Sequence, residues 1–403
     1  MLTRTLAAVS ILLGVCVSRA PQAAPRSFAD DLAFLQQHTT VIVLTGADGA
    51  RVVVAPEYQG RVMTSTADGT GSFGWIGRAA VAGGTRQPHM NVFGGEDRFW
   101  LGPEGGQYAL YFKPGDPFDV DHWQTPEPFD WGAWRVERQS RAAATFTKHM
   151  DLVNYSTTPF SIDVARTVRV LGAADVVNDL HVNPSGVRMA AFESENIVTN
   201  SGTRAWDAVG GLVSIWILGQ FTPTPSTTIA IPFAAGPESR LGPIVNDAYF
   251  GKVPAERLQI KDGVIRFRGD GQFRGKIGLS PLRATGVAGS YDAATHVLTI
   301  VQFTRAPAGA RDYVNSMWET QKEPYRGDAL NSYNDGPLAP GQPGLGPFYE
   351  LESSSPALKL HPGEHATHVH RTFHFQGSEA ALDPIARAVL KAGLADLAAT
   401  FPH

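Results

Sequence analysis

Alternation of apolar and polar residues dominates the middle of this chain and predicts β-strands. In the clearest run, residues 160–170, apolar side chains fall on one face and polar side chains on the other. Similar runs occur at residues 41–44, 51–55, 212–218, 227–233, 264–268 and 296–303. Turn-forming clusters such as Gly269-Asp270-Gly271 separate them. Strands at this density, without helices between them, predict an all-β fold built as a large antiparallel sandwich or barrel.

Helical periodicity appears only near the two ends of the chain. Ser27 with Asp30 forms a capping-box pattern before a short apolar stripe. Near the C-terminus, Asp383 before Pro384 is typical of a helix start, and Gly393 of a helix end. We therefore expect one β domain over residues 27–377, with short helices at both ends and a C-terminal helical segment, 378–403, packed on it.

The composition is that of an ordinary globular protein. Of 403 residues, 43% are hydrophobic and 18% are charged, and 42 glycines and 28 prolines indicate many turns. The formal net charge is −4, which gives no electrostatic basis for binding nucleic acid. Carboxylates, histidines and aromatic residues are therefore the groups to search for chemistry.

Residues 1–24 resemble a secretory signal peptide. Arg4 supplies a positive start, residues 6–17 a short apolar run, and small residues follow. The run is too short to cross a bilayer, so we expect no transmembrane segment and a periplasmic or secreted protein. Cys16 is the only cysteine, so the mature chain can form no disulfide. Attachment of a lipid at Cys16 is the minor alternative, because Val15 fits such a signal poorly.

A pair of glutamates near the C-terminus is the leading candidate for chemistry. In an extended strand, Glu350 and Glu352 project from one face while Leu351 projects from the other. Two strands joined by the Pro362-Gly363 turn account for this region. Carboxyl groups that share a face perturb each other's pKa, which suits acid/base catalysis. The alternative is an edge strand with two solvated glutamates.

A glycine-rich segment and a polar turn offer further ligand groups. Arg98, Trp100 and Glu104 could line a sugar site, since saccharides stack on aromatic rings; alternatively Trp100 is core and Arg98 forms a buried ion pair. In the turn, the candidate binding residues are Asn331, Tyr333, Asn334 and Asp335. We expect Arg98 and part of this turn to meet the two glutamates in one cleft. A calcium site formed by Asp328, Asn331, Asn334 and Asp335 is an alternative, although the spacing matches no defined loop.

Three histidines fall on one face of the last expected strand. His368, His370 and His374 extend too far for all three to bind one ion, because residues two apart on a strand are separated by roughly 6–7 Å. His368 and His370 with a carboxylate from the adjoining strand could hold zinc. The favoured role for His370 is to donate a hydrogen bond to a ligand or to the glutamate pair. No cofactor is expected, and a bound calcium or zinc ion is left as an alternative.

The C-terminal motifs resemble those of the galactose mutarotase-like, or aldose 1-epimerase-like, superfamily. The resemblance rests on Tyr349-Glu350-Leu351-Glu352, on Leu360-x-Pro362-Gly363-Glu364 and on Arg371-Thr372-Phe373-His374-Phe375. The wider chain is similar to an uncharacterised family of secreted bacterial proteins in that superfamily, through blocks at residues 94–106, 192–200, 212–219 and 331–336. The resemblance implies a β-supersandwich, with the catalytic base on the strand that carries Glu350 and Glu352.

One departure from the superfamily affects the expected chemistry. Aldose epimerases pair the base with a histidine acid, and the corresponding block here, residues 195–200, contains no histidine. Glu352 or Glu350 can inherit the base role, and Glu195 or Glu193 could supply the acid. The expected function is mutarotase-like or epimerase-like chemistry on a saccharide. A polysaccharide lyase or glycoside hydrolase, and a carbohydrate-binding protein without activity, are the alternatives. The sequence assigns no particular sugar and no oligomeric state.

Overall fold

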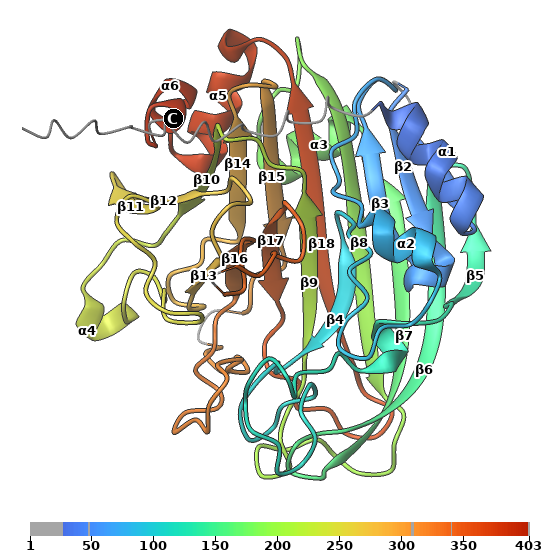
Figure 1. Ribbon diagram of the computed structural model, residues 1–403. Helices are drawn as coiled ribbons and strands as arrows, with labels where there is room; N and C mark the ends of the chain where they lie inside the picture. Colours follow the sequence, from blue (N-terminus) through green and yellow to red (C-terminus); the bar gives the residue numbers. More distant parts are fainter. Residues whose placement is uncertain (1–26, 47–48, 308–309, 340, 402–403) are drawn as a thin grey trace, which may run out of the picture.

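Antiparallel strands dominate the computed structural model, which describes residues 27–46, 49–307, 310–339 and 341–401 (Figure 1). They form sheets of three, ten and five strands. The small sheet has the order β1 (Ile42–Thr45), β2 (Arg51–Ala55) and β3 (Arg61–Thr66). The ten-stranded sheet has the order β11 (Leu258–Lys261), β12 (Val264–Arg268), β10 (Thr227–Pro232), β14 (Val287–Asp292), β15 (Val297–Phe303), β18 (His365–Gln376), β8 (Arg188–Asn200), β7 (Pro159–Val170), β6 (Ala143–Val153) and β5 (Arg135–Gln139). The five-stranded sheet has the order β13 (Gly275–Leu279), β16 (Leu330–Asn334), β17 (Tyr349–Ser354), β9 (Ser214–Phe221) and β4 (Arg98–Gly102).

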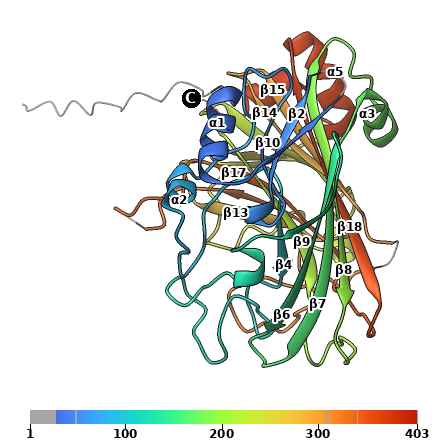
Figure 2. The ribbon, with the colours of Figure 1, turned by 90° about the vertical axis from the view of Figure 1, so that its right-hand side faces the viewer.

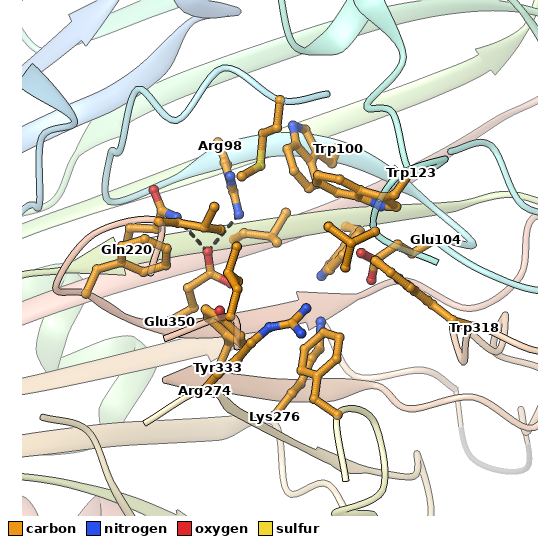
Figure 3. A pocket seen from close by; sticks show the side chains of 18 residues that line it. Arg98, Trp100, Glu104, Trp123, Gln220, Arg274, Lys276, Trp318, Tyr333 and Glu350 are labelled. Carbon is orange, nitrogen blue, oxygen red and sulfur yellow. Dashed lines mark hydrogen bonds and ion pairs between the residues drawn. The ribbon is translucent and has the colours of Figure 1, made fainter. Parts of the chain in front are cut away.

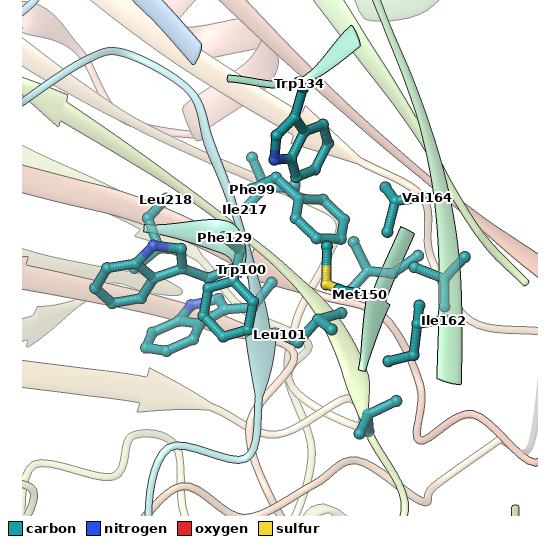
Figure 4. Packing of buried hydrophobic residues seen from close by; sticks show 14 of the residues in the cluster. Phe99, Trp100, Leu101, Phe129, Trp134, Met150, Ile162, Val164, Ile217 and Leu218 are labelled. Carbon is teal, nitrogen blue, oxygen red and sulfur yellow. The ribbon is translucent and has the colours of Figure 1, made fainter. Parts of the chain in front are cut away.

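The five-stranded sheet packs one face against the ten-stranded sheet. At one end of this interface, Ile217 of β9 shares a hydrophobic cluster with Ile162 of β7. At the other end, Leu351 of β17 shares a cluster with Val301 of β15. Figure 4 shows part of the first cluster, where Phe99 contacts Trp134 with ring centroids 5.3 Å apart. Because side chains alternate along a strand, residues adjacent to these core positions project from the opposite face of the five-stranded sheet.

Helices cover two other faces. Their bounds are α1 (Phe28–His38), α2 (Arg78–Gly83), α3 (Ala173–Leu180), α4 (Glu238–Leu241), α5 (Glu379–Leu390) and α6 (Leu394–Ala398), with 3-10 turns at Pro56–Tyr58 and Glu127–Phe129. Helix α1 packs on the three-stranded sheet. Helices α3, α5 and α6 share a cluster with Phe373 and Phe375, on the outer face of the ten-stranded sheet (Figure 2). None of these four helices packs on the outer face of the five-stranded sheet.

The all-β, antiparallel sandwich predicted from the alternation is confirmed. Residues 51–55 and 264–268 form strands with the predicted bounds, and the other four runs and the run at 160–170 are shifted at one or both ends. The N-terminal capping box is also present, with the Ser27 hydroxyl accepting from the Asp30 amide and donating to its carboxylate. The division into one β domain and a helical segment stays a prediction.

The C-terminal helix begins earlier than predicted. Ser378, rather than Asp383, is its N-cap, and Pro384 lies inside α5. Asp383 instead accepts hydrogen bonds from Arg387 and from the amide of Leu394. Gly393 is the N-cap of α6 and not a helix end. The helix continues through Pro384 because its apolar face is buried against the sheet, and this packing outweighs the local cost of proline.

The two strands expected around the Pro-Gly turn do not pair. Strand β17 lies in the five-stranded sheet between β16 and β9, whereas β18 lies in the ten-stranded sheet between β15 and β8. Residues 355–364 carry the chain from one sheet to the other. The interpretation of β17 as an edge strand with solvated glutamates is therefore wrong, because β17 is central in its sheet.

The signal peptide and Cys16 lie outside the described residues, so export stays a prediction. Within the described part of the chain, no helix is both long and apolar enough to cross a membrane.

Candidate active site on the five-stranded sheet

Strand β17 places the two glutamates on the outer face of the five-stranded sheet. Leu351 is fully buried toward the ten-stranded sheet, so Glu350 and Glu352 project the other way. Across the ladder, Glu350 is opposite Gln220 and Tyr333, and Glu352 is opposite Leu218 and Asn331. The shared face predicted from the alternation is therefore present. Both carboxyl groups are buried by what covers the sheet.

Glu350 is held through one of its two oxygens. Its Oε1 accepts from Arg98 Nη2 at 2.7 Å and from Gln220 Nε2 at 2.8 Å. Burial raises the pKa of Glu350 to about 8, against the opposing effect of the Arg98 guanidinium. This pKa is close to neutral pH, where a carboxyl can give up or take a proton readily. Arg98 is therefore both a buried ion-pair partner, as one interpretation predicted, and part of the site.

Glu352 is more deeply buried and is paired with a lysine. Its Oε2 accepts from Lys276 Nζ at 3.1 Å and from the indole N–H of Trp216 at 2.9 Å. Burial alone would lower the pKa of Lys276, but Glu352, Glu104 and Glu350 outweigh it and raise this pKa. The other oxygen of Glu352 has no hydrogen-bond partner among the described residues. Glu352 thus fixes the ammonium group of Lys276 beneath the site.

A cavity lies over this face, with about 650 Å³ of empty space including its mouth (Figure 3). It is in the size range of small-molecule sites. Its polar and charged lining comes from Arg98, Glu104, Gln220, Arg274, Lys276, Tyr333 and Glu350. Its apolar lining comes from Met90, Trp100, Val120, Trp123, Trp216, Leu218, Phe250, Trp318, Leu338, Leu345 and Phe348. Glu350 is thus the member of the pair whose side chain faces the cavity, while Glu352 lies beside it.

Tryptophans form much of the wall. Trp100 and Trp216 are nearly fully buried, with ring centroids 5.6 Å apart, and the Arg98 guanidinium lies 4.1 Å from the Trp100 ring. Trp123 and Trp318 are half-buried and stacked 6.1 Å apart. Half-buried indole faces beside fixed polar groups are suited to stacking on the apolar face of a sugar ring. Trp100 is thus a core residue and a cavity residue at once.

Glu104 is the second carboxyl group that lines the cavity. It follows β4 in the glycine-rich segment, and Figure 3 shows it across the cavity from Glu350. Burial raises the pKa of Glu104, while the positive charge of Lys276 and of Arg274 acts in the opposite direction. Two carboxyl groups with raised pKa values therefore face one space.

The polar turn contributes unequally to the site. Tyr333 lines the cavity, and its hydroxyl donates to Asp335 at 2.9 Å. Asp335 also accepts from the amide of Gly346 at 2.9 Å, so it anchors the loop that carries Leu338, Leu345 and Phe348. Asn334 projects from the other face and binds backbone groups of Phe273 and Gly271. It is brought to the sheet but not to the cavity.

Asn331 belongs to a hydrogen-bonded network beside Glu352. Its amide donates to the hydroxyl of Tyr249 at 3.1 Å, and Tyr249 donates to Asp328 at 2.7 Å. Burial raises the pKa of Asp328 to about 6. These groups are satisfied by one another, so the alternative calcium site gains no support from their geometry. Across the described ranges, no group of three or more His, Cys, Asp and Glu side chains is arranged to hold a metal ion.

Glu195 and Glu193 do not reach the cavity. Both project from the outer face of the ten-stranded sheet, where Glu195 is exposed and Glu193 pairs with Arg371 at 2.7 Å. The inner positions of β8 at this point are Ser194 and Asn196. The structure therefore does not bring either proposed acid to Glu350, because strand alternation turns both outward.

His368 and His370 lie between the two large sheets. Each has a ring nitrogen 2.8 Å from the hydroxyl oxygen of Ser353, on the inner face of β17. Burial lowers the pKa of His368 to about 3 and that of His370 to about 4, so both rings are neutral. His370 is thus separated from Glu350 and from the cavity by the five-stranded sheet itself.

Several cavity residues were missed at the level of sequence. Arg274, Lys276, Gln220, Trp123, Trp216, Trp318 and Phe250 all line the space. The run at 212–218 was identified as a strand, but it is apolar on both faces, so the side of Trp216 was not evident. Lys276 lies on β13 and Glu352 lies on β17, with β16 between them. The strand order was therefore needed to find that pair.

A family model matches nearly all of the chain. The model described as "Family of unknown function (DUF6786)" matches residues 26–401. The chain belongs to this family. No curated protein matches the DUF6786 chain in sequence.

Three solved structures are similar to this DUF6786 chain. A candidate aldose 1-epimerase from Escherichia coli K12 is 14% identical, with a TM-score of 0.49 over 83% of this chain and 98% of that one. A galactose mutarotase-like protein from Lactobacillus casei is 11% identical, with a TM-score of 0.47 over 84% and 100%. The Slr1438 protein from Synechocystis is 13% identical, with a TM-score of 0.49 over 84% and 96%.

Proposed function

We propose that the protein binds a saccharide in the cavity of the five-stranded sheet and acts on it by acid/base catalysis at Glu350. One observation carries the proposal: the Glu350 carboxyl, with a pKa raised by burial to about 8, faces a cavity walled by tryptophans. Arg98 and Gln220 both hold Oε1, which orients the carboxyl and leaves Oε2 for a ligand. Oriented acid/base groups with pKa values near the working pH are those that catalyse best.

The reaction favoured is mutarotase-like or epimerase-like opening of a sugar ring. One group must accept the proton of the anomeric hydroxyl while another gives a proton to the ring oxygen as the bond from C1 to that oxygen breaks. The raised pKa of Glu350 suits the proton donor. Glu104 takes the acceptor role, because nearby Lys276 and Arg274 favour its ionised form. Ring closure reverses the two transfers, so the pair needs no histidine.

Replacement of Glu350 by glutamine tests this proposal. The amide oxygen of the new side chain can still accept from Arg98 and Gln220, but the amide cannot exchange a proton with the substrate. Turnover should therefore fall by roughly 10²–10⁴-fold with little change in affinity. Exchange between sugar anomers, followed by NMR across a panel of saccharides, measures the effect. Glu195→Gln should keep wild-type turnover, because Glu195 is exposed on the far sheet. Equal turnover in wild type and Glu350→Gln would refute the proposal.

Glycoside hydrolysis or polysaccharide cleavage is the second candidate function. It is favoured by the presence of two cavity carboxyl groups, Glu104 and Glu350, which is the minimum set for two-carboxylate hydrolysis. New reducing ends released from oligosaccharides, without anomer exchange of monosaccharides, would identify it. Binding without any turnover would instead mark a carbohydrate-binding protein, in which Glu350→Gln shifts affinity by about 1–3 kcal/mol.

A further inference from the structure

Three cationic side chains line the cavity, and they differ in how they are paired. Arg98 pairs with Glu350 at 2.7 Å, and Lys276 pairs with Glu352 at 3.1 Å. Arg274 has no ion pair and no side-chain hydrogen bond with any other described residue, although its side chain is half-buried. An arginine that is partly removed from water without an anionic partner has donors available for something else.

The unpaired guanidinium is nevertheless held in place. It lies 3.8 Å from the centroid of the Phe250 ring, a stacking contact that fixes the plane of the group. Its Nε is buried without a partner among the described residues. Figure 3 shows the guanidinium between Glu350 and Lys276, directed into the cavity. Arg274 directly precedes β13, two residues before Lys276, and both side chains line the cavity.

The balance of charge in the cavity also favours an anion. When Glu350 is protonated, below about pH 8, Arg98 keeps its charge without a full counter-ion. With Glu104 ionised as the proton acceptor and Glu352 paired with Lys276, two carboxylates are set against the three cations. The cavity then carries an excess of one positive charge. In a cavity with tryptophan walls, such an excess attracts negative charge strongly.

We propose that the saccharide bound here is anionic, and that Arg274 binds its carboxylate or phosphate group. The inference rests on the proposed function, since it specifies the substrate of that same cavity. A guanidinium forms two parallel hydrogen bonds with a carboxylate or a phosphate, so Arg274 would select charged sugars and fix their orientation. The sugar ring would then lie against the half-buried faces of Trp123 and Trp318.

An alternative role for Arg274 is purely electrostatic support of Glu104, whose pKa it lowers. The two roles predict different results for a neutral sugar. If Arg274 only supports Glu104, Arg274→Gln should change turnover and its pH profile equally for neutral and charged sugars. If Arg274 binds the anion, loss should be confined to charged sugars and should appear in affinity.

The test measures binding of three matched sugars by calorimetry: glucuronate, glucose 6-phosphate and glucose. We expect one of the two anionic sugars, or both, to bind at least about tenfold more tightly than glucose. Arg274→Gln should weaken binding of that sugar by about 10- to 100-fold and leave glucose within about twofold. Arg274→Lys should restore only part of the loss, because it lacks the planar fork. Arg138→Gln, at an exposed arginine of β5, is the control and should change nothing.

The failure of this inference can be told apart from failure of the proposed function. Tighter or equal binding of glucose, with Glu350→Gln still lowering turnover, would overturn the anionic substrate alone. Loss of affinity for all three sugars on Arg274→Gln would assign Arg274 to support of the site rather than to the anion. If no saccharide binds to the wild-type protein, both proposals fall.

Discussion

Two groups of buried charges, on opposite faces of the five-stranded sheet, differ in how completely the protein satisfies them. The first lies between the large sheets and is formed by Asp97, Arg166, Ser194 and Asn196. The second lines the cavity. Apart from the half-buried Arg274, the charged residues of both groups are buried, and both groups combine carboxylates with cations. Burial therefore does not separate them.

In the inter-sheet group, every charged atom has a partner in the protein. Arg166 donates to Asp97 at 2.5 Å, to Asn196 at 2.6 Å and to the carbonyl of Gly60 at 3.1 Å. The second oxygen of Asp97 accepts from Ser194 at 2.8 Å. Each charged donor and acceptor of the group is thus used, which is the mark of a structural polar network.

Around the cavity, several buried polar atoms have no partner among the described residues. They are Trp100 Nε1, Gln220 Oε1, Glu352 Oε1, Arg98 Nε and Arg274 Nε. An unsatisfied buried polar atom costs about 1–3 kcal/mol unless water or a ligand completes it. For these two groups, completeness of hydrogen bonding, rather than burial or charge, separates the cavity residues from the inter-sheet network.

The largest effect on stability is expected when an ion pair of the inter-sheet group is removed. Arg166→Met removes the partner of Asp97 and leaves a fully buried carboxylate unpaired, so the free energy of unfolding should fall by about 3–5 kcal/mol. Arg274→Gln, in the cavity, should change it by less than about 1 kcal/mol, because Arg274 has no ion pair to lose. Urea unfolding of both variants measures the difference. Similar losses in the two would remove the distinction.

The pH dependence of the free energy of unfolding tests the raised pKa of Glu350 in the cavity. The unfolded Glu350 carboxyl loses its proton near 4.5, whereas the folded protein holds it up to about 8. Between these values the folded state binds more protons, so the contribution of Glu350 to stability is full below the lower value and is lost as pH rises through the upper one. Wild type should therefore lose stability relative to Glu350→Gln across this window, by at most about 1.4 kcal/mol per pH unit. A constant difference between the two proteins would contradict the raised pKa.

The smallest effect concerns the loop that covers the cavity. Tyr333→Phe removes the hydrogen bond to Asp335, which anchors this loop through Gly346. We expect stability to fall by about 0.5–1.5 kcal/mol and saccharide affinity by severalfold, measured by thermal unfolding and calorimetry. Unchanged affinity with reduced stability would show that the anchor serves the fold and not the site.

The strand pattern was sufficient to predict the all-β antiparallel class and the shared face of the two glutamates, but not the pairing of β17 and β18. Alternation with a period of two placed Glu350 and Glu352 on one face of their strand. The same rule puts Glu193 and Glu195 on the face of β8 that does not carry Ser194, but the sequence did not show which of the two faces is buried. The contact between Arg98 and Glu350 was predicted, although the two residues are 252 apart in sequence. The pair of Lys276 and Glu352 was not, because only the strand order reveals it. Arg274 and Trp318 lie outside the named strands, where no periodicity marks the direction of a side chain.

The difference between the expected and observed C-terminal helix has a similar origin. Local rules assign Asp383 and Pro384 to a helix start, but Leu382 and Ile385 are buried in the same cluster on the ten-stranded sheet. Tertiary packing decides the bounds of that helix. The bounds of this helix could not be predicted from the local sequence alone.

The most direct test is a crystal structure of the protein with a bound saccharide from the calorimetric panel. The sugar should occupy the cavity, with one hydroxyl or ring oxygen within hydrogen-bond distance of Glu350, a ring face against tryptophan, and, for a charged sugar, its anionic group on Arg274. The unpaired atoms of Trp100 and Gln220 should then acquire partners from the sugar or from ordered water. A saccharide bound elsewhere on the surface, with this cavity holding water alone, would contradict the assignment of the site.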